Sequence, residues 1–279
     1  MNNKLNKYLD GIFLPYEDLP TVKELKEELL NDLHEKFNDY KHQGYDEETA
    51  YNMTVNSIGD ISEIIECISA NTRELKQLSS KDFSKINLQD SDFIGVSVHD
   101  SKFDYSDLKR SDFTGSDLSE SSFKSSDMVD VRLDGTNLSG AIIDMSDMRN
   151  VSFSGANLTE AKLDMSDMRN ANFDGANLTR ARLKMCDLRG SSFGSCILDY
   201  TDFSSSDLSG VCFDNMTLTG TIFGKTGLKG TSFRNAFLRD VSFRWSDPKK
   251  TIFDGATMDK LTYAVLKGTK ADLSNVTVI

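Results

Sequence analysis

Histidine, cysteine and aspartate are the side chains through which this 279-residue sequence could act as a base, a nucleophile or a metal ligand. Its three histidines are His34, His42 and His99. His34 and His42 lie eight residues apart on a predicted amphipathic helix, and no acidic residue is placed to complete a ligand set with them. The glycines recur at regular intervals, so none of them forms a phosphate-binding loop. Solvent-exposed positions explain the histidines, and we predict a non-enzyme with no catalytic residues, metal site or cofactor.

The cysteine pattern indicates reduced thiols. Cys67, Cys186, Cys196 and Cys212 form no CxxC pair and have no histidine at metal-binding spacing. We therefore expect a cytoplasmic protein. The sequence contains no run of about 18 apolar residues, so we expect no transmembrane helix and no membrane insertion.

A column of aspartates recurs every 20 residues, and a basic column begins two residues after it. If the chain coils with this period, the aspartates stack along one outer face about 4.8 Å apart. Two interpretations are open. The aspartates and the basic residues neutralise one another as ion pairs worth at most about 1 kcal/mol each, or the aspartates mimic the charge of DNA. Residues 131–279 carry a net charge of +1, which favours the ion pairs. The aspartates are Asp107, Asp127, Asp147, Asp167, Asp187 and Asp207, and the basic residues are Lys109, Arg149, Arg169, Arg189, Lys229 and Lys249.

An apolar column runs beside the aspartates and is expected to face outward at a corner of each coil. Exposed methionines form soft, adaptable surfaces of the kind used in protein binding. Shielding of the corner backbone is the alternative explanation. We take this column as the candidate partner surface: Tyr105, Met145, Met165, Met185 and Trp245.

These columns depend on a five-residue period that runs without a break from Phe83 to Val278. Thirty-eight of its forty positions are apolar, and only Pro248 and Gly268 depart. The residue two before each apolar position is usually small, so the two side chains can pack inward together. The residue two after it is often glycine or asparagine, which fits a type II turn whose third residue needs a positive φ.

The apolar positions predict one continuous core. All fourteen phenylalanines at these apolar positions have numbers ending in 3, so two opposite sides of each 20-residue coil are expected to carry phenylalanine and the others leucine or methionine. Ten coils at about 4.8 Å each would give a rod roughly 45–50 Å long. The predicted core includes Phe83, Phe103, Phe123, Phe153, Phe173, Phe193, Phe213, Phe233, Leu118, Leu138, Leu158 and Leu178.

Residues 79–279 resemble a pentapeptide-repeat protein, whose pattern is A(D/N)Lxx. The pattern is carried by Ser106-Asp107-Leu108, Ala156-Asn157-Leu158 and Ala176-Asn177-Leu178, among others. The resemblance implies an all-β fold, a right-handed quadrilateral β-helix, and a role in binding other proteins. Departures at Phe237, Pro248 and Gly268 predict irregular geometry in the last two coils.

Residues 1–78 predict a small α-helical bundle with a net charge of −8. We expect a short helix near residues 5–10, a helix that begins with a capping box at Thr21 and Glu24, and further helices after Asp46 and Asp60. The last of these would cap the N-terminal edge of the rod. The sequence around Glu24–Leu30 and Ile58-Gly59-Asp60 resembles the bacterial permease prefix domain, which implies a regulatory or protein-binding accessory role.

The C-terminal sequence predicts an apolar, unpaired edge without a capping helix. Such an edge favours pairing with a second copy, so we expect a homodimer through the C-terminal coil. The candidate dimer edge comprises Tyr263, Val265, Leu266, Val276, Val278 and Ile279.

Two functions remain open. The first is a non-catalytic interaction or regulatory protein with an unknown protein partner, in which the helical part recognises the partner and the rod is a docking scaffold. The second is a DNA-mimicking binder of DNA gyrase or topoisomerase IV, as the pentapeptide-repeat resemblance suggests. The net charge of −12 disfavours direct nucleic-acid binding in either case.

Overall fold

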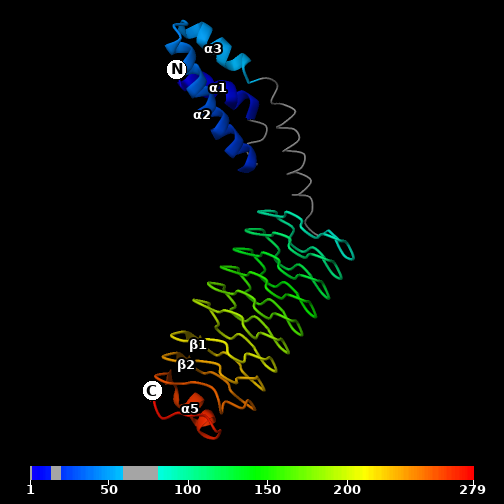
Figure 1. Cartoon of the computed structure of the whole chain (residues 1–279), viewed down its shortest axis with the longest axis vertical. Coiled ribbons are helices and arrows are strands. Elements are labelled where there is room, and N and C mark those ends of the chain that lie inside the picture. The colour runs from blue at the N-terminus through cyan, green and yellow to red at the C-terminus, as the bar shows by residue number, and fades with distance from the viewer. Residues whose placement is uncertain (1, 14–19, 59–80) are drawn as a thin grey trace. The chain divides into compact units, whose positions relative to one another are not determined.

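The computed structural model describes residues 2–13, 20–58 and 81–279, and the chain divides into two compact units, residues 1–77 and 78–279 (Figure 1). The first unit is helical. The second consists of stacked coils, and we call it the β-helical unit.

The described helices of the first unit are α1 (Asn2–Phe13), α2 (Pro20–His42) and α3 (Glu47–Asn56). Leu5, Leu9 and Phe13 recur at helical spacing and are buried, and they form a core with Leu33 of α2. The apolar side of α1 that this spacing creates explains why α1 packs against α2.

The start of α3 was predicted from Asp46. The carboxylate of Asp46 accepts hydrogen bonds from the backbone N–H groups of Glu48 (3.1 Å) and Thr49 (3.0 Å), as an N-cap requires. The predicted start of α2 is wrong by two residues, because the helix begins at Pro20 and Thr21 lies inside its first turn. The helix predicted after Asp60, with its capping role, lies outside the described residues.

In the β-helical unit, paired residues lie 20 positions apart and in parallel register. Four short strands form one sheet in the order β1 (Thr217–Thr219), β2 (Phe237–Arg239), β3 (Thr257–Met258) and β4 (Thr277–Val278). Thr217 pairs with Phe237, and Phe237 pairs with Thr257. The other sides of the coils make isolated bridges with the same 20-residue offset, such as Asn157 with Asn177.

The corners of the coils have the backbone that the sequence predicts. At Phe153–Ala156 the N–H of Ala156 donates to the carbonyl of Phe153 (2.9 Å), and Gly155 has φ +66°. Every fifth residue from Lys85 to Gly255 has a positive φ except Lys250. Lys250 follows Pro248, which was predicted to disturb the pattern.

Phenylalanines stack along the inside of the unit. The Phe173 ring lies 4.9 Å from the ring of Phe153 and 4.9 Å from that of Phe193, nearly parallel to both. Rings on opposite sides meet edge to face, as Phe193 and Phe203 do at 5.8 Å. Phe83 is half-buried, and the other predicted core residues are at most 1% exposed: Phe103, Phe123, Phe153, Phe173, Phe193, Phe213, Phe233, Leu118, Leu138, Leu158 and Leu178.

The small inward residues do more than leave room for the large ones. The hydroxyl of Ser166 donates to the carbonyl of Ile143 (3.0 Å) and accepts from the N–H of Ser146 (3.1 Å), so it links neighbouring coils. Cys186 takes the same place and donates its thiol to the carbonyl of Leu163 (3.0 Å). The sequence predicted that small residues point inward, but it did not predict that they form an internal ladder of hydrogen bonds.

The C-terminal end corrects the prediction that no capping helix is present. Helix α5 (Lys260–Lys267) occupies the place where the period predicts further strands. The Asp259 carboxylate accepts from the N–H groups of Leu261 (2.7 Å) and Thr262 (3.0 Å), and Gly268 ends the helix. Leu266 is fully buried in the core of the unit, whereas Leu261, which the period placed inside, is 66% exposed.

Candidate functional site

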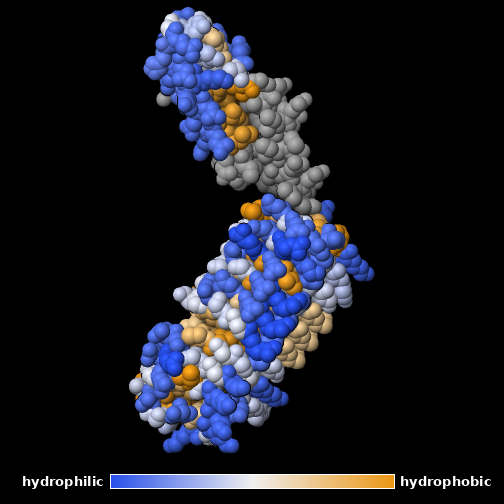
Figure 2. All heavy atoms as spheres, in the orientation of Figure 1, coloured by the Kyte–Doolittle hydropathy of each residue, from blue (hydrophilic) through white to orange (hydrophobic). Residues whose placement is uncertain are grey.

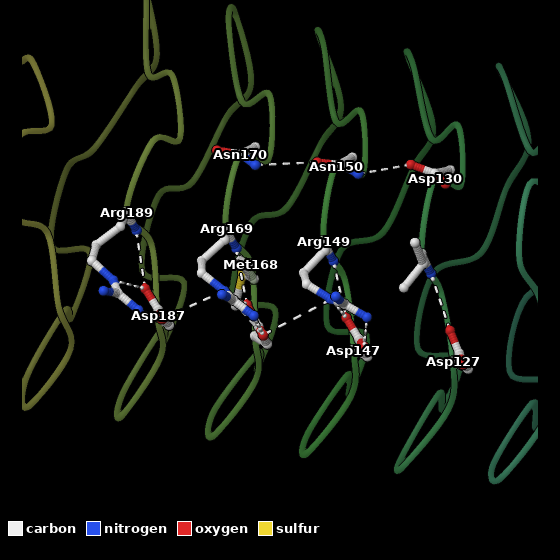
Figure 3. A network of polar contacts seen from close by, with 12 residues as sticks. Asp127, Asp130, Asp147, Arg149, Asn150, Met168, Arg169, Asn170, Asp187 and Arg189 are labelled. Atoms are coloured by element: carbon white, nitrogen blue, oxygen red, sulfur yellow. Dashed lines mark hydrogen bonds and ion pairs between the residues drawn. The ribbon is translucent and has the colours of Figure 1, made fainter.

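The aspartate and arginine columns form one ladder of ion pairs on the outside of the coils (Figure 3). Within a coil, Arg169 Nη2 lies 2.6 Å from Asp167 Oδ2, and Arg189 Nη2 lies 2.5 Å from Asp187 Oδ2. Between coils, Arg169 Nε lies 3.7 Å from the carboxylate of Asp187. Each arginine therefore bridges the aspartate of its own coil and that of the next.

The ladder extends toward lower residue numbers with a lysine. Lys109 Nζ lies 2.6 Å from Asp127 and 3.4 Å from Asp107. The next position of the basic column is occupied by Val129, which is uncharged. Arg149 resumes the ladder at 2.7 Å from Asp147. The six aspartates thus lie along one face in register, and basic side chains compensate them.

Hydrogen bonds from arginine lower the pKa of two aspartates of the ladder, Asp167 and Asp187. The guanidinium of Arg169 donates to Asp167, and the pKa of Asp167 is lowered mainly by this bond. The pKa of Asp187 is lowered in the same way by Arg189, whose own pKa is raised. These carboxylates are ionised near neutral pH and are held by cations, so the face does not present the uncompensated negative charge that DNA mimicry needs.

A groove of about 460 Å³ lies over the arginines of the ladder. A second row forms one of its walls, in which Asn170 Nδ2 donates to Asn150 (3.3 Å) and Asn150 Nδ2 donates to Asp130 (2.9 Å), as Figure 3 shows. At Gly190 a Cβ atom would lie 2.4 Å from the side-chain oxygen of Asn170, so a larger residue there would require the Asn170 side chain to shift. The groove is lined by Val129, Arg149, Asn150, Arg169, Asn170, Arg189 and Gly190.

The methionine column lies at the corners beside this ladder and faces solvent. Met145 is 53% exposed, Met165 is 47% exposed and Met185 is 55% exposed. All three have φ near +58°, a conformation that glycine adopts more easily than a side-chain-bearing residue. Backbone geometry therefore does not explain why methionine occupies these corners.

The other members of the predicted partner surface lie apart from the three methionines. Tyr105 is 62% exposed and Trp245 is 69% exposed, and Ser125, Ser205 and Lys225 interrupt the column between them and the methionines. On the visible face, Figure 2 shows apolar residues of the β-helical unit in separate patches among hydrophilic ones.

Trp245 has surroundings of its own. The guanidinium carbon of Arg244 lies 4.0 Å from the centre of its ring, and Lys225 Nζ lies 5.5 Å from the same centre. Both cations face the electron-rich surface of the indole, which is a favourable cation–π arrangement. The sequence pattern grouped Trp245 with the methionines, but its contacts are cationic.

The predicted dimer edge is partly exposed and partly internal. Val265, Val278 and Ile279 are 40%, 41% and 56% exposed, respectively. Leu266 was placed on this edge in error, because α5 carries it into the core. Tyr263 and Val276 are half-buried and pack against that core. β4 is the last strand of its sheet, so one side of it is unpaired within the described residues.

The remaining histidines and cysteines that the structure describes do not converge on a site. His42 and His99 are exposed, and His34 is half-buried. Burial raises the pKa of Cys186 to about 12 and that of Cys196 to about 12, while Cys212 is exposed. Across the described ranges, no cluster of histidine, cysteine or acidic side chains could hold a metal ion. No described helix is long and apolar enough to cross a membrane.

Comparison with protein families identifies the repeat. Residues 146–223 match the family described as "Pentapeptide repeat region", and residues 82–119 and 116–155 match "Pentapeptide repeats (8 copies)". No curated protein matches this chain in sequence. The family predicted from the sequence is therefore confirmed for the repeat region, and no finding bears on the predicted permease prefix domain.

Several solved structures are similar. QnrB1, a plasmid-mediated fluoroquinolone resistance protein in a trypsin-treated form, is 16% identical over 66% of this chain and 93% of its own, with a TM-score of 0.50. HetL, a pentapeptide repeat protein involved in heterocyst differentiation regulation from the cyanobacterium Nostoc sp. strain PCC 7120, is 24% identical over 62% of this chain and 89% of its own, with a TM-score of 0.38. The likeness to QnrB1 shows the fold alone, a right-handed quadrilateral β-helix.

Proposed function

Because this chain is a pentapeptide-repeat protein over residues 82–223, we propose that it is a non-catalytic protein-binding protein whose β-helical unit is a rigid docking scaffold. The observation that carries the proposal is the run of three exposed methionines at successive corners, Met145, Met165 and Met185. Flexible thioether side chains adapt to the shape of a bound surface and gain free energy when water leaves them.

The charges beside the methionines support apolar recognition. Arg182 lies 2.5 Å from Asp164, and Lys184 lies 2.8 Å from Asp202. On the other side, the arginine ladder neutralises its aspartates. A partner that docks here meets an apolar strip between compensated charges, so burial of the methionines supplies the affinity and the ion pairs form a polar rim.

The acidic helical unit is the proposed recognition or regulatory module, as its resemblance to the permease prefix domain suggests. We propose domains of residues 1–78 and 79–279, a cytoplasmic location, and a homodimer through the exposed part of the C-terminal edge. Light scattering at tens of micromolar protein tests the last point. A dimer mass supports it, and a monomer mass at that concentration removes it.

The second candidate is a DNA-mimicking modulator of DNA gyrase or topoisomerase IV. The alignment of Asp107 to Asp207 along one face favours it, and the arginines that bridge these aspartates count against it. A supercoiling assay with purified gyrase separates the two candidates. Inhibition that disappears when the six aspartates are replaced by asparagine would support mimicry, and absence of inhibition at micromolar protein would exclude it.

The proposed function is tested by capture from a bacterial lysate with the full chain as bait. The test variant carries Met145→Ser, Met165→Ser and Met185→Ser, and the control carries Asn150→Ser and Asn170→Ser at another exposed corner. We expect a specific protein to be retained by the wild type and the control and lost from the methionine variant. Equal retention by all three baits would show that the methionines are not the docking surface.

A further inference from the structure

The ion-pair ladder stops at Gly227, where the period calls for aspartate. Lys229, two residues later, therefore lacks the partner that Arg169 and Arg189 have in their own coils. Asp247 follows one coil later, but it makes no ion pair with Lys229 or Lys249 in the part of the chain that the structure describes. The break leaves cations without carboxylates.

The difference extends across the coils around the break. Each of the five arginines in residues 141–190 forms an ion pair. The seven lysines and arginines in residues 225–250 form none with any described carboxylate. Lys225, Lys229 and Lys249 are exposed, and they lie on or beside the corner that carries Trp245.

We propose that this surface binds an acidic segment of a partner protein. The basic tryptophan patch comprises Lys225, Lys229, Arg244, Trp245 and Lys249. Carboxylates of the acidic segment would pair with these cations, and Arg244 could bind one of them in a bidentate manner. The exposed indole of Trp245 would bury apolar area at the centre of the contact. The patch extends the proposed protein-binding role to a second surface, which does not depend on the methionines.

The geometry favours an acidic peptide over a nucleic acid. Single-stranded nucleic acids bind by stacking bases on free aromatic faces. At Trp245 the Arg244 guanidinium lies 4.0 Å from the ring centre and Lys225 Nζ approaches the same ring, so cations compete for that surface. The net charge of −12 also repels a long polyanion, whereas a short acidic segment meets mainly the local positive charge.

The sequence provides a direct probe, because Trp245 is the only tryptophan of the chain. Full-length protein is titrated at low ionic strength with a short synthetic peptide of alternating glutamate and leucine. Binding is followed by tryptophan fluorescence and, in parallel, by calorimetry. A peptide with lysine in place of glutamate and an oligothymidylate of equal charge are the comparison ligands.

The test variant is Gly227→Asp, which completes the ladder without removing any residue of the patch. A Cβ at Gly227 would lie 3.1 Å from Asp207 Oδ1, the flexible end of a side chain that can shift. The control is Gly194→Asp, which adds the same charge outside the aspartate column. It has the same 3.1 Å approach, to Asp174 Oδ1.

We expect saturable binding of the glutamate peptide that weakens about threefold to tenfold in Gly227→Asp, as exposed ion pairs would predict. Gly194→Asp and the triple methionine variant should bind as the wild type does, and added salt should weaken binding. Absence of binding by both methods would overturn the proposal. Equal weakening by both aspartate variants would do the same, and tighter binding of oligothymidylate would assign the patch to nucleic acid instead.

Discussion

The middle and the C-terminal end of the β-helical unit share one core and differ on their surfaces. In residues 141–190 the corners carry methionines, and the arginines beside them are paired. In residues 225–267 the aspartate ladder is broken at Gly227, the corner carries Trp245 between cations, and α5 replaces the regular coil. Inward residues are constrained by the need to stack, whereas outward residues can vary at a much smaller cost in stability. Different partners can therefore be accommodated along one scaffold.

The largest effect should come from the shared core. Phe173→Ala removes a ring stacked at 4.9 Å on both neighbours, and we expect the free energy of unfolding to fall by about 3–5 kcal/mol. Phe237→Ala is the control, because Phe237 is only half-buried and lies on the outer surface of β2. Urea denaturation followed by circular dichroism measures both. Equal losses would mean that the stack does not dominate stability.

The next effect separates the end of the unit from its middle. Leu266→Ala should cost about 2 kcal/mol or more, because Leu266 is a fully buried apolar contact between α5 and the core. Leu261→Ala, in the same helix at 66% exposure, should change stability little. Hydrogen exchange of the α5 amides reports the loss locally. Unchanged protection in Leu266→Ala would contradict the assigned packing.

The internal hydroxyl ladder predicts a smaller effect. Ser166→Ala removes one hydrogen bond to Ile143 and one from Ser146, and we expect a loss of about 1 kcal/mol. Ser166→Cys should retain part of the stability, since Cys186 already donates from the equivalent position. If Ser166→Ala left the free energy of unfolding unchanged, the small inward residues would be needed for packing alone and not for their hydrogen bonds.

The smallest effect concerns the ion pairs and their pH dependence. The pKa of Asp167 is lowered below 3.8 mainly by the Arg169 hydrogen bond. Its contribution is present above pH 3.8 and is lost as the pH falls through the lower folded-state pKa. Asp167→Asn should cost about 0.5 kcal/mol at neutral pH and low salt, and less in acid. The measurement is the denaturation midpoint at neutral and acidic pH, and a constant difference between wild type and variant would contradict the ion-pair explanation.

Much of the β-helical unit could be predicted because the residues that it buries recur with a five-residue period in the sequence. The apolar residue at every fifth position specifies the core, and glycine or asparagine at a corner, as at Gly155, indicates a positive φ. The number of coils remains a prediction. The aligned aspartates also followed from the period, but the partners of their charges needed side-chain geometry.

Helix α5 was missed because its sequence satisfies two patterns at once. Tyr263 keeps the five-residue period, while Asp259 caps a helix and Thr262 and Leu266 lie one helical turn apart. The helix gains the buried Leu266, and this tertiary contact decides between the patterns. The basic tryptophan patch was missed for a related reason. The sequence shows Gly227 as a gap in the aspartate column, but only the structure shows that the cations beyond it form no ion pair with a described carboxylate.

The most direct test of the proposed docking surface is site-specific photo-crosslinking. A photoreactive phenylalanine analogue is placed at Met165 or, as the control, at Asn170, and the full chain is irradiated in a bacterial lysate. If the methionine corners bind a protein, one discrete adduct forms from position 165 and is absent from position 170. No adduct at position 165, or the same adducts from both positions, would contradict the central claim.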